Sequence, residues 1–104
     1  MALQGKGILT QDVSVLREAE AIYREVLAAT DRNKAPRDWA SATKDVATIQ
    51  FMLGTTLMDK AMVEESIRNF DRALDEFKRS GSFMDRMMIG AMRDNAAKAL
   101  DLFK

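Results

Sequence analysis

The chain contains no cysteine and no histidine. These absences exclude disulfide bonds, thiol redox chemistry, zinc sites built from Cys and His, and nucleophiles that a histidine base activates. A site of carboxylates alone stays open, because it needs only several Asp or Glu side chains that converge from different helices. The sequence therefore names no catalytic residue, no cofactor and no metal ligand, and we do not expect an enzyme.

Proline and glycine are scarce, and neither sign of charge is in excess. One Pro and five Gly leave little of the turn chemistry that a β-rich fold requires. Sixteen basic and sixteen acidic residues cancel, whereas nucleic-acid-binding domains usually carry a basic excess. No apolar run approaches the roughly 20 residues that span a bilayer, and the first nine residues are too short and polar for a signal peptide. We expect a cytoplasmic protein that binds neither nucleic acid nor membrane.

What the chain does have is helix-forming residues in an amphipathic arrangement. Hydrophobic residues make up 47% and charged residues 31% of its 104 residues, which suits one domain with one modest core. Apolar residues recur every three or four positions over about 10–30, 37–58, 62–79 and 83–103. The sequence predicts a single all-α domain over 1–104, with four antiparallel helices as two hairpins and a loose segment at 1–9.

Capping and turn residues mark the ends of these helices. Thr10 and Ser82 are the expected N-caps of the first and last helices, and Asp85 completes a weak capping box with Ser82. Pro36 suits the first turn of the second helix, and Ser80–Gly81 ends the third. The first helix is expected to stack six apolar residues on one packed face: Val13, Leu16, Ala19, Tyr23, Val26 and Leu27.

A row of small residues runs along the second helix at seven-residue spacing: Ala40, Ala47 and Gly54. Small side chains in such a row let a neighbouring helix approach closely. Gly54 costs a helix roughly 1 kcal/mol relative to alanine, and close packing is the compensation that we expect. We predict that the notch at Gly54 and the ring of Phe70 interlock neighbouring helices.

The chain also shows weak internal similarity. Tyr23 and Phe70 lie 47 positions apart, and at the same offset Leu27 corresponds to Leu74. Such self-similarity is typical of helical repeat proteins.

The spacing of several residues resembles the tetratricopeptide repeat, in which Leu-Gly and a third apolar residue precede an aromatic residue and Ala-Leu in the next helix. The matching residues are Leu53, Gly54, Leu57, Ser66, Phe70, Ala73 and Leu74. The segment Pro36–Ala40, which includes Trp39, is similar to the lead-in of long-period bacterial arrays of this type, although Leu53 follows seven residues late. The resemblance covers roughly 19–74. It implies a fragment of a right-handed α-α superhelix, protein binding and no reaction.

Two surfaces are candidates for that binding. Phe51, Thr55 and Met58 occupy the side that lines the concave groove in the family, where a partner helix or extended peptide would bind. The alternative is that Phe51 and Met58 pack against the first helix.

The second candidate is a methionine cluster in the last helix: Met84, Met87, Met88 and Met92. Methionine is common at adaptable binding surfaces and also fills gaps in cores. Because the terminal helix of an array is expected to be polar outside, part of this surface is expected to meet a second copy or a further repeat. A monomer is the alternative.

Other conspicuous residues have structural interpretations. Trp39 is expected in the core rather than as a platform for a ligand. The acidic pairs are expected to be solvated charges rather than acid–base dyads: Glu18/Glu20, Glu64/Glu65 and Asp75/Glu76. The sequence favours a non-enzymatic protein-interaction scaffold. The alternatives are a self-associating oligomerisation domain, such as a homodimer, and a small helical ligand-binding bundle.

Overall fold

The computed structural model describes the backbone of residues 2–80 and 82–104, and the side chains of the same residues from Val13 onward. These residues form four α-helices and a short 3-10 helix, and none of them is in a strand. The elements are α1 (Ala2–Ala29), α2 (Pro36–Thr56), α3 (Lys60–Ser80), α4 (Phe83–Ala99) and η1 (Leu100–Phe103). The all-α prediction is confirmed.

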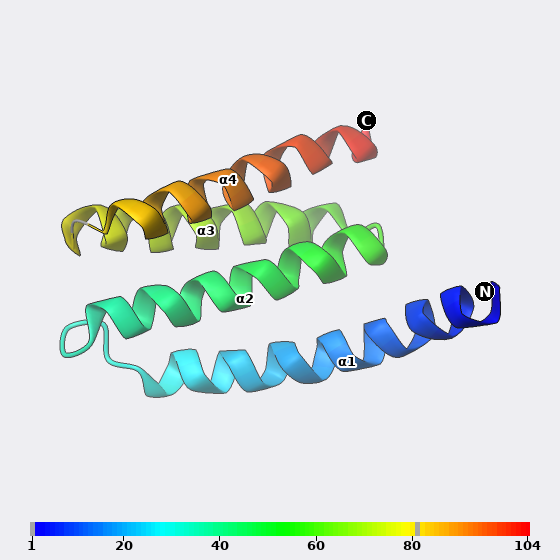
Figure 1. Ribbon diagram of the computed structural model, residues 1–104, viewed down its shortest axis with the longest axis horizontal. Coiled ribbons are helices and arrows are strands. Elements are labelled where there is room, and N and C mark those ends of the chain that lie inside the picture. The colour runs from blue at the N-terminus through cyan, green and yellow to red at the C-terminus, as the bar shows by residue number, and fades with distance from the viewer. Residues whose placement is uncertain (1, 81) are drawn as a thin grey trace.

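Consecutive helices run antiparallel and lie beside one another in chain order (Figure 1). The α2–α3 contact is the most extensive, and α4 packs on α3 and also reaches α2. Within the described residues, the backbone of α1 lies close to α2 and to neither α3 nor α4. The molecule extends 46 × 29 × 24 Å along its principal axes. The α2–α3 pair is thus the centre of the fold, flanked by α1 and α4.

The row of small residues on α2 lies in the α2–α3 interface, as the sequence predicts. A Cβ added at Gly54 would lie 2.7 Å from Cγ2 of Val63. In an antiparallel pair with this register, Ala47 lies opposite Phe70, seven residues further from the turn on each helix. Ala47 and Phe70 are buried in one cluster. The prediction needs one correction, because the side chain that fills the notch at Gly54 is Val63 and not Phe70.

A second, smaller cluster holds α1 against α2. Leu16 of α1 is buried with Ile49 and Leu53 of α2, and Ala19, Tyr23 and Met62 pack around them. The expected packed face of α1 is therefore present over Leu16 to Tyr23. Val26 was expected on that face, but it is exposed.

The first helix begins earlier than predicted. Residues 2–9, expected as a loose segment, are helical, and Thr10 lies inside α1 instead of capping it. The two glycines of this segment each cost about 1 kcal/mol in a helix but do not forbid one. Met1 lies outside the described residues.

The remaining boundaries differ from the prediction by one or two residues, except at the end of α4. Pro36 opens α2 as expected. Ser82 is the N-cap of α4, but its hydroxyl donates to the Asp85 carboxylate and makes no bond to the backbone. The expected stop at Gly81 lies outside the described residues. The last turn, predicted as α-helix to 103, is the 3-10 helix η1.

The turn between α2 and α3 is short, and it provides hydrogen-bond partners for backbone groups at the end of α2 and at the start of α3. The Asp59 N–H donates to the Gly54 carbonyl at 2.8 Å, and the Met58 N–H donates to the Thr55 carbonyl at 3.4 Å. This pair of bonds is the Schellman motif, with Met58 at the position that glycine usually holds. Met58 adopts φ 53, a left-handed conformation. The Asp59 carboxylate then caps α3 by accepting the Met62 N–H at 3.2 Å.

Candidate functional site

The first two turns of α4 present a continuous set of exposed apolar side chains, here called the Met-rich face. Its members are Phe83 (61% exposed), Met84 (76%), Met87 (59%) and Met88 (49%). The inner side of α4 is anchored by Ile89, which is fully buried against the core. Exposed apolar groups that adjoin one another in this way mark interaction surfaces more often than isolated ones do. The Met-rich face includes three of the four methionines of the predicted cluster, Met84, Met87 and Met88.

The fourth methionine of the predicted cluster, Met92, lies one helical turn further along α4. It is half-buried and packs against the core cluster. Met92 therefore offers less surface to a partner than the residues of the Met-rich face do.

The other candidate surface is not a single apolar patch. Phe51 is half-buried and packs against the cluster of α2, α3 and α4 residues, not against α1. The Thr55 hydroxyl donates to the carbonyls of Phe51 and Met52 at 3.0 and 3.1 Å. Met58 is exposed in the turn. Of the three residues, only Met58 presents a large apolar surface.

Most residues of the repeat-like motif lie where helix packing requires them. Leu53 is buried in the α1–α2 cluster. Phe70 and Ala73 are buried in the larger cluster, and Trp39 and Leu74 are half-buried against it. Leu57 is exposed, because α2 ends at Thr56 and Leu57 caps it.

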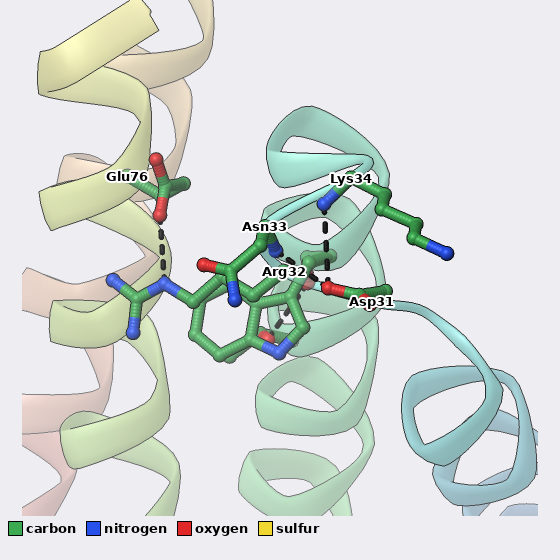
Figure 2. Close-up of polar contacts among 7 residues, drawn as sticks. Asp31, Arg32, Asn33, Lys34 and Glu76 are labelled. Carbon is green, nitrogen blue, oxygen red and sulfur yellow. Dashed lines mark hydrogen bonds and ion pairs between the residues drawn. The ribbon is translucent and has the colours of Figure 1, made fainter.

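A polar cluster fastens the α1–α2 loop to α3. Figure 2 shows the Arg32 side chain pointing to Glu76, with Arg32 Nε donating to Glu76 Oε1 at 2.7 Å. The guanidinium also lies 4.2 Å from the centre of the Trp39 ring. Asp31 shapes the loop, since its carboxylate accepts the N–H groups of Asn33 and Lys34 at 2.8 and 3.3 Å (Figure 2).

This cluster corrects the prediction for one acidic pair. Glu76 was expected to be solvated beside Asp75, but its side chain is only 8% exposed and is paired with Arg32. Arg32 was not singled out from the sequence, because the two residues are 44 positions apart and no local spacing links them.

A second polar contact lies inside the α2–α3 interface. Asn69 Nδ2 donates to Gln50 Oε1 at 2.7 Å, and Arg72 donates to Asn69 Oδ1 at 3.2 Å. Gln50 and Asn69 are both buried, and Gln50 Nε2 has no partner among the described residues. These bonds fix the register of α2 on α3, since a shift of either helix would leave two buried amides unpaired.

Within the part of the chain that the structure describes, no three acidic side chains come close enough to hold a metal ion. The same part contains no helix with the length and hydrophobicity to cross a bilayer.

Comparison of the chain with protein-family models, with curated proteins and with solved structures finds no match. Its resemblance to the tetratricopeptide repeat therefore depends on its own residues alone.

Proposed function

We propose that the protein is a non-enzymatic interaction scaffold of the tetratricopeptide type, which binds a partner protein through the Met-rich face. The observation that carries the proposal is the exposure of four large apolar side chains on two adjacent turns of α4. Methionine side chains adapt to different partner shapes because they are unbranched and polarizable. The repeat-like part of the proposal is supported by the close approach of Gly54 and Val63.

Self-association is the second candidate function. On the outer side of α4, Met84, Met88, Ala91 and Asn95 follow one another at steps of four, three and four, and all four are exposed. This is the spacing of residues that pair two helices. A second copy that packs α4 against α4 would cover the Met-rich face, and the buried Asn95 would select the register of the pair.

Substitution of exposed residues tests the first proposal without disturbing the core. We expect Met84→Gln/Met87→Gln to abolish retention of a partner in affinity capture from a cell extract, because glutamine keeps the length but not the apolar surface. Leu102→Gln is the matched control, since Leu102 is 60% exposed in η1, which follows the far end of α4. The proposal would be contradicted if the double variant and Leu102→Gln captured the same proteins in equal amounts.

Sedimentation of the purified chain at several concentrations separates the two functions. A dimer that the double variant dissociates and Leu102→Gln leaves intact would support self-association. A monomer at all concentrations, with capture that needs Met84 and Met87, would support a different partner.

A further inference from the structure

A second apolar surface lies on α1, distant in sequence from the Met-rich face and independent of the proposed function. Val15 and Ile22 are each 58% exposed, and Val26 is 49% exposed. Val15, Ala19, Ile22 and Val26 follow at steps of four, three and four, so they line one side of α1. We call these four residues the α1 seam. It extends about 16 Å along the helix, which is three turns.

The seam adjoins the face that packs on α2, and Ala19 lies at the border, since it also packs on the α1–α2 cluster. Leu16 and Tyr23 make that contact, and each is one residue after a seam residue. One residue turns the helix by about a quarter of a circle. The α1 helix thus has two apolar sides, and only one of them is covered by the described part of the chain.

The charges beside the seam are acidic. Glu18 and Glu25 follow Val15 and Ile22 by three residues, which places them along the edge of the seam. Both are exposed, and neither forms an ion pair with any residue that the structure describes. Arg17 lies on the far side of the helix. Arg24 also lies on the far side, and it forms an ion pair with Glu20 at 3.5 Å.

These charges decide between two occupants. If a second copy paired antiparallel on the seam, Val15 of each copy would face Val26 of the other. Glu18 of each copy would then come close to Glu25 of the other copy. Like charges at such positions are destabilising. A helix with an apolar stripe bordered by Lys or Arg meets the same seam with attraction instead. We propose that the α1 seam binds a basic amphipathic helix of a partner protein.

Two synthetic helical peptides test this proposal with the full chain. Both carry Leu at steps of four, three and four, and one has Lys and the other Glu beside the Leu stripe. We expect the protein to bind the Lys peptide at least roughly three-fold more tightly in fluorescence anisotropy. The preference should shrink in about 0.5 M salt, because exposed charges are screened. Ile22→Gln should reduce binding of the Lys peptide, with circular dichroism to verify folding.

Charge reversal supplies the decisive comparison. Glu18→Lys/Glu25→Lys should invert the preference so that the Glu peptide binds more tightly. Glu64→Lys/Glu65→Lys is the matched control, since it changes net charge equally at two exposed residues of α3 and should leave the preference unchanged. Equal binding of both peptides, or an equal effect of the control, would overturn the proposal. So would sedimentation that detects a dimer dissociated by Ile22→Gln, because a second copy would then occupy the seam.

Discussion

Gly54 and Val63 face each other so closely that a methyl group on Gly54 would lie 2.7 Å from Cγ2 of Val63. It would also lie 3.0 Å from the Val63 backbone nitrogen and 3.3 Å from the Asp59 carbonyl oxygen. Movement of the Val63 side chain alone would therefore not make room for it. The absence of a side chain at Gly54 determines how near α2 and α3 lie at the turn.

The first prediction concerns this contact. Gly54→Ala should lower the free energy of unfolding by about 1–2 kcal/mol, although alanine favours helix by roughly 1 kcal/mol, because overpacking costs more. Urea titration measures the change. Gly90→Ala is the control, since a Cβ at Gly90 meets nothing within 4 Å. That variant should be neutral or more stable, and an equal loss in both variants would refute the argument.

The second prediction concerns the turn. Met58 holds a left-handed conformation with its side chain exposed, and this conformation costs an L-residue about 1 kcal/mol. Met58→Gly should therefore raise the free energy of unfolding by roughly 0.5–1 kcal/mol. Thermal denaturation measures the effect, and Met52→Gly is the control. Met52 is an exposed methionine inside α2, so glycine there should destabilise. A loss of stability in Met58→Gly would contradict the assigned turn.

The third prediction concerns Arg32 and Glu76. Arg32→Met should lower the free energy of unfolding by about 1–3 kcal/mol, because it leaves the Glu76 charge buried without a partner. This range is below that for a fully buried pair, since Arg32 is itself 41% exposed. A double-mutant cycle with Glu76→Gln isolates the coupling. Arg24→Met removes the more exposed pair with Glu20 and should cost less than about 1 kcal/mol.

The fourth prediction concerns the buried amides. Asn69→Leu should destabilise the fold by about 1–3 kcal/mol, because the Gln50 amide would lose its only side-chain partner. Gln50→Leu/Asn69→Leu removes both polar groups and should recover much of that loss. Chemical denaturation of the two single variants and the double variant gives the comparison. A double variant with the summed loss of both single variants would show that the bond contributes no coupling.

The features that the sequence predicts best are those that depend on local spacing. The seven-residue row of Ala40, Ala47 and Gly54 identified the α2–α3 interface because small residues repeat there with the period of a packed helix face. Phe70 and Ala73, which the sequence singled out by the spacing of the repeat-like motif, are both buried. Local spacing could not find Val63 as the partner of Gly54, since the register of two helices depends on the length of the turn between them.

The features that the sequence did not predict depend on distant partners. Glu76 is buried because Arg32 approaches it from another loop, and no neighbour of Glu76 signals this. Val26 was assigned to the packed face of α1, although α1 turns a different apolar side to α2. The two apolar sides of α1 are adjacent, so periodicity alone does not separate them.

The attachment of α1 to a single neighbour has a consequence for how the molecule opens. Because the backbone of α1 lies close to α2 and to neither α3 nor α4 in the described part of the chain, we expect it to detach while the other three helices stay folded, as a separate cooperative unit. The bond from Arg32 to Glu76 holds the following loop on α3, so this opening should stop near residue 31. Backbone amides of α1 should exchange with deuterium earlier than those of α2 and α3. A partner bound to α1 would slow that exchange, and it could thereby report occupancy of this helix without any change in the rest of the fold.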